Sequence, residues 1–271
     1  MRNNITLTPG FPLDALGPDG RIGVIALATD FNIERELRRL FPPGVELFTS
    51  RVLNHNPLTI DNLRTMKPGI CKTAATLLPG TELDVVIYAC TSGTVAIGEE
   101  AIRALIQSVR PGVCVTNPVT AAMAAFDALK AQRLSILTPY TSAVNATMAQ
   151  VFSSQKTEVL NIAGFGFEDD TAMTAISQAD IEQAALATCH PDADLLFISC
   201  TALRSADLIT GLEAALGKAV VTSNQVLLWH SLRLLNYPHP LPGLGQLLMH
   251  HLGHPTPIHP REPQTHAAPA D

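Results

Sequence analysis

Two cysteines of this chain lie in nearly the same local sequence. Residues 84–92 read DVVIYACTS and residues 194–202 read DLLFISCTA, so each cysteine ends a mostly apolar run and precedes a threonine. Such a run is typical of a strand buried on both faces, and it places Cys90 and Cys200 where a strand gives way to a turn and a helix. The field of a helix N-terminus lowers the pKa of a thiol and increases the thiolate fraction.

Two thiols in this setting predict one of two chemistries. One thiolate removes a proton from one face of a carbon while the other thiol returns a proton to the opposite face, or one thiolate attacks while the second acts as an acid. The alternative for both cysteines is a packing role at a strand end. Of the other three, Cys71 falls in a helical pattern, Cys114 in a strand and Cys189 at a helix end, which favours packing.

Strand-like and helix-like segments alternate along the chain, which favours an α/β fold with parallel sheets. The expected strands are residues 21–28, 45–52, 84–90, 112–116, 133–139, 157–165, 192–200 and 218–223. The expected helices are residues 31–40, 61–78, 94–109, 118–131, 141–154, 178–189, 205–217 and 224–235.

The two halves of the chain repeat one another. RIGVIAL begins at residue 21 and RLSILTP at residue 133, and Cys90 and Cys200 follow 69 and 67 residues later. This offset predicts two pseudo-symmetric, Rossmann-like lobes with the active site in the cleft between them, at the carboxyl ends of the strands. The expected division is an N-terminal arm (1–20), lobe 1 (21–117 plus 224–240), lobe 2 (118–223) and a loose C-terminal tail (241–271).

The composition indicates a globular protein. The chain is 46% hydrophobic and 15% charged, and its net charge of −6 comes without a charged run, so neither nucleic acid nor a membrane surface is an expected partner. The first twenty residues hold no continuous apolar stretch, and we expect a soluble, cytoplasmic protein. The histidines of the tail are irregularly spaced, and no metal site is expected there.

The segments YACTSGT and ISCTALRS resemble the two cysteine motifs of the aspartate/glutamate racemase superfamily. Within it the chain resembles the maleate isomerase and arylmalonate decarboxylase branch, and most of all the EutA-type proteins of ectoine utilisation, over roughly residues 20 to 235. The resemblance implies two α/β lobes, a catalytic pair formed by Cys90 and Cys200, no cofactor or metal, and a homodimer. Decarboxylases of this branch keep only the second cysteine, so the presence of both argues against decarboxylation.

Three further positions match the family pattern. Asp30 and either Asp169 or Asp170 stand where maleate isomerases carry asparagines, and Tyr140 matches a tyrosine of those enzymes. An ionised aspartate repels a substrate carboxylate but attracts an ammonium group, so these changes favour an amino acid over maleate. Asp30 could instead only cap the helix that follows it, Tyr140 could only pack, and Asp169 and Asp170 could lie in a solvated turn.

The sequence thus predicts a cofactor-independent isomerase that inverts Cα of aspartate or 3-hydroxyaspartate. Cys90 and Cys200 would exchange the protons, the aspartates would hold the ammonium, and Tyr140 would orient a carboxylate. Donors to the α-carboxylate would come from Thr91, Ser92, Thr201 and Ala202. The alternatives are cis–trans isomerisation of maleate by thiolate addition and, in another class, a two-lobed amino-acid-binding protein without catalysis.

Overall fold

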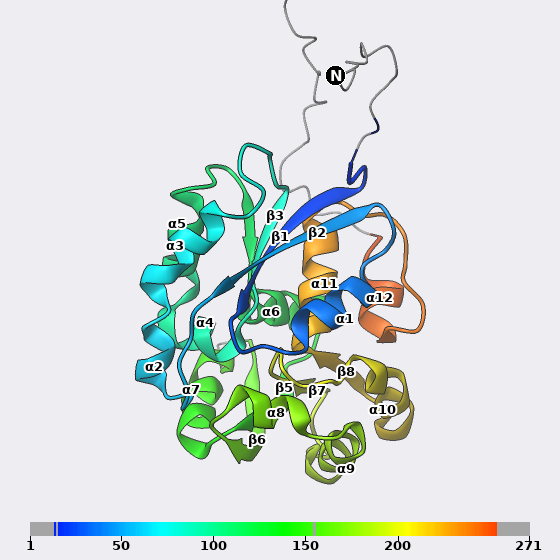
Figure 1. The fold of residues 1–271 in the computed structure, drawn as a ribbon. Helices are drawn as coiled ribbons and strands as arrows, with labels where there is room; N and C mark the ends of the chain where they lie inside the picture. Colours follow the sequence, from blue (N-terminus) through cyan, green and yellow to red (C-terminus); the bar gives the residue numbers. More distant parts are fainter. Residues whose placement is uncertain (1–13, 15, 154–155, 254–271) are drawn as a thin grey trace, which may run out of the picture.

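The computed structural model describes residues 14, 16–153 and 156–253 and contains two sheets, each with four parallel strands. The first sheet has the order β2-β1-β3-β4 and the second the order β6-β5-β7-β8, so the second half repeats the topology of the first. Figure 1 shows the two sheets in the upper and lower parts of the molecule, each covered by helices. This arrangement confirms the expected α/β fold class. The strands are β1 (Gly20–Leu27), β2 (Val45–Val52), β3 (Val85–Tyr88), β4 (Cys114–Thr116), β5 (Arg133–Tyr140), β6 (Glu158–Phe167), β7 (Leu195–Ile198) and β8 (Ala219–Thr222).

The helices follow the strands as the alternating pattern predicts. They are α1 (Ile33–Leu40), α2 (Ile60–Arg64), α3 (Lys67–Ala75), α4 (Thr91–Ile97), α5 (Glu99–Gln107), α6 (Pro118–Ala128), α7 (Ser142–Phe152), α8 (Asp170–Ala175), α9 (Gln178–Thr188), the 3₁₀ helix η1 (Ala206–Leu208), α10 (Ile209–Leu216), α11 (Ser223–Leu234) and α12 (Gly245–His250). The central strands β3 and β7 are buried along their whole length, because helices cover both faces of each sheet.

Three expectations about helices are wrong in detail. The helix expected over 61–78 is two helices separated by Thr65 and Met66, and the helix expected over 94–109 is interrupted at Gly98, where φ is 94°. Residues 241–253 do not form a loose tail, since α12 lies there and Leu247 and Leu248 are buried. The rest of that expected tail, residues 254–271, and residues 1–13 of the expected arm lie outside the described residues.

Loops from the two halves meet where the strands of both sheets end. The Leu58 amide, in the segment after β2, donates to the Glu168 carbonyl after β6 over 2.8 Å. Thr201, after β7, donates from its hydroxyl to Asp30, after β1, over 3.0 Å. The carboxyl ends of the two sheets are therefore joined by hydrogen bonds, and the residues predicted to do chemistry come from these loops.

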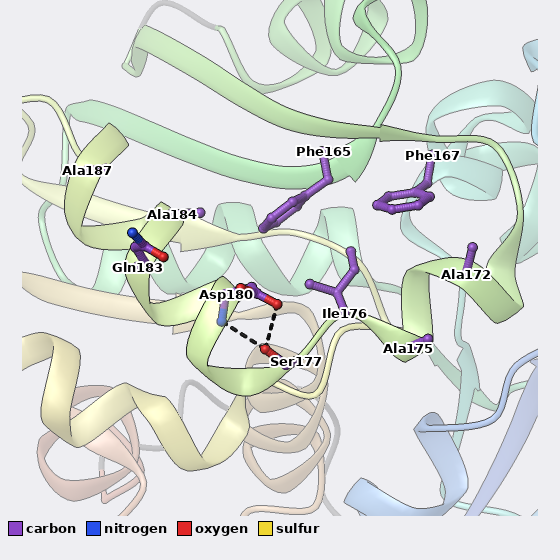
Figure 2. Close-up of a pocket in the computed structure, with 10 residues that line it drawn as sticks. All are labelled: Phe165, Phe167, Ala172, Ala175, Ile176, Ser177, Asp180, Gln183, Ala184 and Ala187. Carbon is purple, nitrogen blue, oxygen red and sulfur yellow. Dashed lines mark hydrogen bonds between the residues drawn. The ribbon is translucent and has the colours of Figure 1, made fainter.

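A separate hollow of about 710 Å³ lies between β6, α8 and α9. Figure 2 shows Phe165 and Phe167 of β6 facing Ile176, with the hydrogen-bonded pair Ser177 and Asp180 at the start of α9. The predicted site residues are absent from its lining, so this hollow is distinct from the cysteine pair. Across residues 16–153 and 156–253, no helix combines the length and apolarity that a membrane span requires.

Candidate active site

Cys90 is the N-cap residue of α4 and takes part in the first turn of that helix. Its backbone is extended (φ −150°, ψ 117°), and its Sγ accepts a hydrogen bond from the Gly93 amide at 3.1 Å. The Ser92 hydroxyl lies 3.7 Å from the same sulfur. A Cβ on residue 93 would lie 2.9 Å from this Sγ and 2.6 Å from the Tyr88 hydroxyl, so glycine is the residue that lets helix and thiol meet.

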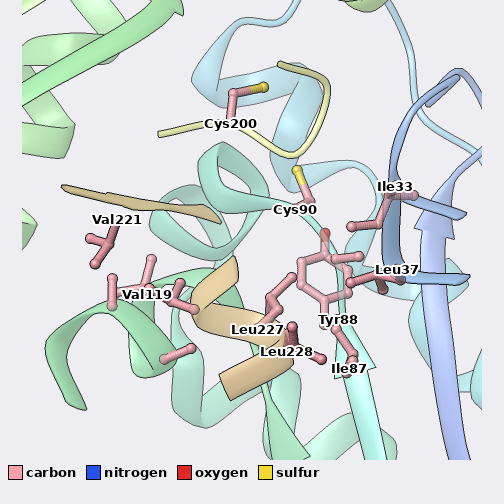
Figure 3. Packing of buried hydrophobic residues seen from close by; sticks show 14 of the residues in the cluster. Ile33, Leu37, Ile87, Tyr88, Cys90, Val119, Cys200, Val221, Leu227 and Leu228 are labelled. Carbon is pink, nitrogen blue, oxygen red and sulfur yellow. The ribbon is translucent and has the colours of Figure 1, made fainter. Parts of the chain in front are cut away.

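Cys200 lies in the loop after β7, and backbone groups hold it in place. Its Sγ accepts a hydrogen bond from the Ala202 amide at 3.4 Å, and its own amide donates to the Ser223 hydroxyl at 3.0 Å. Cys90 and Cys200 are 3% and 5% exposed, so both thiols are nearly enclosed. In the view of Figure 3, the Cys90 sulfur points toward the loop that carries Cys200, whereas the Cys200 sulfur points sideways.

Tyr140, the last residue of β5, lies close to both thiols. Its hydroxyl is near the Cys200 thiol and near the Ser92 hydroxyl, which in turn lies 3.7 Å from the Cys90 sulfur. Burial and the nearby charges of Cys200 and Cys90 raise the pKa of Tyr140 well above its ordinary value. The tyrosine is therefore a neutral hydroxyl placed between the two cysteines.

The expectation of a lowered thiol pKa is wrong. Burial raises the pKa of Cys90 to about 12, with a further increase from Asp170, and the Gly93 amide offsets only part of this. Burial also raises the pKa of Cys200, against the lowering effect of the Tyr140 hydroxyl. The helix that the sequence indicated is present after Cys90, the N-cap of α4, but loss of water outweighs its field. After Cys200 the next element is η1, which begins only at Ala206.

Asp30 is buried and joins three elements. Its Oδ1 accepts hydrogen bonds from the amides of Asn32 and Ile33 at 2.7 and 2.8 Å, and its Oδ2 accepts from the Thr201 hydroxyl at 3.0 Å. Burial raises the pKa of Asp30, while these hydrogen bonds lower it. Asp30 therefore caps the start of α1 and also ties β1 to the loop of Cys200, and its negative charge raises the pKa of both thiols.

The two aspartates after β6 have different surroundings. Asp169 is the N-cap of α8, where its side chain accepts from the Ala172 amide at 2.9 Å and from the Asn56 amide group. Asp170 is 4% exposed, and its Oδ2 accepts from the Thr29 hydroxyl and from Asn54 Nδ2. Burial raises the pKa of Asp170. Of this pair, Asp170 is the one whose charge acts on both Cys90 and Cys200.

The threonine hydroxyls beside the cysteines hydrogen-bond to protein groups, which leaves backbone amides as the available donors. Thr91 Oγ1 is 3.0 Å from Ser223 Oγ, and Thr201 Oγ1 is held by Asp30. Within the described part of the chain, the amides of Thr91, Ser92 and Thr201 have no hydrogen-bond acceptor. The Ala202 amide is directed at the Cys200 sulfur. These N–H groups at two loop ends can bind a carboxylate.

Sequence reasoning missed two residues of this site, Asn54 and Ser223. Asn54 donates to both Thr29 and Asp170, and Ser223 connects the Cys200 amide to Thr91. A signal was available in both cases, because each residue follows a strand of the repeated topology at the edge where the cysteines lie. The contacts of Asn54 with Asp170 and of Ser223 with Thr91 join segments more than one hundred residues apart. The contacts with Thr29 and with the Cys200 amide join segments more than twenty residues apart. Local sequence patterns do not reveal contacts of this kind.

The structure is an α/β fold that encloses two cysteines near the carboxyl ends of two parallel sheets. The family model described as arylmalonate decarboxylase (Amdase) matches residues 49–248, and the chain belongs to this family of enzymes. Membership of this family confirms the resemblance to the maleate isomerase and arylmalonate decarboxylase branch that the sequence indicated.

Individual relatives are more distant. The chain is 24% identical over 242 residues to a maleate isomerase of Pseudomonas putida, and the aligned region covers 84% of this chain and 96% of the relative. It is 27% identical over 125 residues to an arylmalonate decarboxylase of Bordetella bronchiseptica, and the aligned region covers 45% of this chain and 52% of the relative. Its fold is similar to that of a Nocardia farcinica maleate cis-trans isomerase mutant that carries a covalently bound succinylcysteine intermediate. The TM-score is 0.78 at 21% sequence identity, and the match covers 85% of this chain and 98% of the other.

Proposed function

We propose that this protein is a cofactor-independent isomerase that inverts Cα of an aspartate-like amino acid, with Cys90 and Cys200 as its acid–base pair. The closeness of both thiols to Tyr140 supports a shared role. The resemblance to the EutA-type proteins favours aspartate or 3-hydroxyaspartate as the substrate, in ectoine or hydroxyectoine breakdown. Inversion of 3-hydroxyaspartate would occur at C2 only.

The two cysteines account for both proton transfers of this reaction. One cysteine, as thiolate, takes the α-proton and becomes a thiol, and the other thiol gives its proton to the opposite face of the carbon and becomes the thiolate. Each turnover exchanges the protonation states of Cys90 and Cys200. A thiolate whose pKa is raised by burial is a stronger base than an exposed one, which suits the weakly acidic α-hydrogen.

The single observation that carries the substrate class is the free oxygen of Asp170. Its Oδ2 is held by Thr29 and Asn54, whereas Oδ1 accepts no hydrogen bond from the described residues. A carboxylate fixed by one oxygen and open at the other is suited to binding an ammonium group. A substrate carboxylate at about 4 Å would instead cost on the order of 4 kcal/mol at an effective dielectric of 20.

The carboxylates of the substrate would bind to the neighbouring donors. The amides of Thr91, Ser92, Thr201 and Ala202 lie at the two cysteine loops, and charge that develops on the α-carboxylate during deprotonation would be stabilised by them. Tyr140, as a neutral hydroxyl, would donate to a carboxylate oxygen. Asp30 would add negative charge that favours the ammonium, although three hydrogen bonds already occupy its oxygens.

A second candidate is cis–trans isomerisation of maleate. The similarity to maleate isomerases over most of the chain favours it, and the Nocardia structure contains a succinylcysteine, the product of adding a cysteine sulfur to a C4 acid. In this chain, Cys90 or Cys200 would add to the double bond and be eliminated after rotation. A two-lobed binding protein without turnover is the alternative outside the enzymes.

A panel of acids in deuterated water, followed by proton NMR, separates these functions. We expect deuterium to enter Cα of aspartate or 3-hydroxyaspartate with inversion, and maleate to remain unchanged. Asp170→Asn should lower amino-acid turnover by about a hundredfold through loss of the charged contact, while Asp169→Asn, a helix-cap change one residue away, should retain most of it. Conversion of maleate to fumarate with no exchange at Cα would establish the second candidate, and binding without exchange the third.

A further inference from the structure

A second cavity, of about 310 Å³, lies on the outer side of the segments that carry the site residues. It is bordered by the start of α1, by α8 and by the loop after Cys200. Its polar lining consists of Asn32, Arg35, Thr171, Thr174 and Arg204, and Phe31 forms an apolar wall that is 68% exposed. We refer to it as the seam cavity.

The seam cavity contains two arginines that form no ion pair with the described residues. Within residues 16–153 and 156–253, neither Arg35 nor Arg204 has a carboxylate within ion-pair distance. Arg204 donates from Nη2 to the Ile176 carbonyl at 2.9 Å, and its buried Nε has no partner among those residues. Of the nearby carboxylates, Asp207 pairs with Arg39 while its charge also acts on Arg35, and Glu34 pairs with Arg51. The cavity therefore offers two positive charges to an anion.

The rest of the lining defines the size and kind of that anion. Thr171 is an exposed residue with a hydroxyl, and Phe31 and Ala175 add apolar surface to the same lining as the two arginines. A guanidinium binds a carboxylate through paired N–H donors, and the apolar wall accommodates a short carbon chain. These features fit a short-chain carboxylate better than a bare inorganic anion.

The seam cavity and the cysteine pair share their supporting residues. Asn32 Nδ2 donates to the carbonyls of Thr201 and Leu203 at 3.0 and 3.1 Å, and the Thr201 hydroxyl reaches Asp30. Thr171 directly follows Asp170, and Arg204 follows Cys200 by four residues. The inner site carries the negative charges of Asp30 and Asp170, which oppose an approaching carboxylate, whereas the outer cavity carries positive charge.

We propose that the seam cavity is a second binding site, specific for small carboxylates, that recruits the anionic substrate to the cysteine pair. The recruiting role rests on the proposed function, and the binding of a carboxylate does not. Arg35 and Arg204 attract the anionic substrate, which the carboxylates of the inner site repel. The two arginines therefore increase the rate of substrate association, and this effect falls as ionic strength rises.

Succinate alone is the probe for the binding itself. We expect wild type and Arg38→Gln, an exposed control on the same helix, to bind succinate equally in an NMR titration at low salt. Arg35→Gln and Arg204→Gln should each weaken binding about tenfold or more, as expected for loss of a charged hydrogen bond. Arg35 is exposed and lies on the surface of α1, so its variant decides the matter even if Arg204→Gln does not fold. Unchanged succinate affinity in Arg35→Gln overturns the proposal.

Turnover tests the recruiting role separately. With the substrate identified by the acid panel, Arg35→Gln should lower kcat/KM about tenfold at low salt, leave kcat within about twofold, and lose its effect at high salt. Weakened succinate binding with kcat/KM unchanged would retain the site and reject its recruiting role. If the protein turns over no acid in the panel, the proposed function is rejected. The succinate titration would still test whether the seam cavity binds a carboxylate.

Discussion

Asn54 and Asp170 follow the edge strands of two different sheets, β2 and β6, and are joined by a hydrogen bond of 3.0 Å from Nδ2 to Oδ2. The repeated topology thus brings two topologically similar loop positions, one from each half, into contact beside the thiols. The asparagine also bonds Thr29, so it orients Asp170 from the opposite half of the molecule.

The first prediction follows from this contact. The hydrogen bond from Asn54 lowers the pKa of Asp170, against burial that raises it, so Asn54→Ala should raise this pKa further. If Asp170 must be ionised to bind an ammonium, the acid limb of the kcat/KM profile should move to higher pH. Asn56→Ala is the matched control, because Asn56 bonds Asp169 instead. An acid limb at the wild-type position in Asn54→Ala would remove Asp170 from substrate binding.

Gly93 gives the second prediction. A Cβ there would lie 2.9 Å from Cys90 Sγ and from Met66 Cε, so Gly93→Ala must displace the thiol or the helix. We expect a stability loss of about 1–3 kcal/mol from overpacking and a large loss of turnover. Gly211→Ala, in α10 with open space around its Cβ position, should instead be neutral or stabilise by up to about 1 kcal/mol. Urea unfolding and turnover of both variants test this, and a fully active Gly93→Ala would contradict it.

Ser223 is the subject of the third prediction. Its hydroxyl accepts from the Cys200 amide and contacts Thr91, so Ser223→Ala leaves a buried amide without its partner, at a cost of about 1–3 kcal/mol. Because the two cysteine loops then lose one of the contacts that join them, kcat should fall about tenfold or more with KM little changed. Ser231→Ala is the control, since Ser231 is also buried in α11 and its hydroxyl has no partner among the described residues. Equal kinetics in the two variants would show that Ser223 does not position the thiols.

The fourth prediction concerns stability at alkaline pH. Burial raises the pKa of Cys90 to about 12 and that of Cys200 further, so the folded protein keeps protons that the unfolded chain releases above about pH 8.5. Between that pH and about 12 the unfolded state is increasingly favoured, by up to about 1.4 kcal/mol per pH unit for each thiol. The double variant Cys90→Ala/Cys200→Ala should lose less unfolding free energy than wild type between pH 8 and 10, whereas Cys71→Ala should follow wild type. Parallel curves for wild type and the double variant would show that the thiols are not held in the neutral form.

The strands could be predicted from sequence because most of them coincide with apolar runs that alternate with helix-like segments, although β3, β4, β7 and β8 are only three or four residues long. The duplicated cysteine segment also indicated that Cys90 and Cys200 occupy corresponding positions of the two sheets, since a local repeat in sequence often reflects a repeated structure. The interruption at Gly98 was not foreseen, because apolar periodicity continues through it and only the backbone conformation changes. The short helix α12 was missed for another reason, since Leu247 and Leu248 are buried only through packing against distant parts of the chain.

The thiol pKa was predicted with the wrong sign because the sequence reveals the helix next to Cys90 but not the depth of burial. The choice between Asp169 and Asp170 was left open for a similar reason. Both follow β6 directly, and only the arrangement of Thr29 and Asn54 around Asp170 distinguishes them.

The central claim is that Cys90 and Cys200 act together on one carbon, and single-cysteine variants test it most directly. Each pure enantiomer of aspartate and of 3-hydroxyaspartate is incubated in deuterated water with wild type, Cys90→Ala or Cys200→Ala, and Cα is followed by NMR. We predict that both variants lose inversion by about a hundredfold or more, while Cys71→Ala, Cys114→Ala and Cys189→Ala retain it. Wild-type inversion rates in either Cys90→Ala or Cys200→Ala would contradict a two-thiol mechanism.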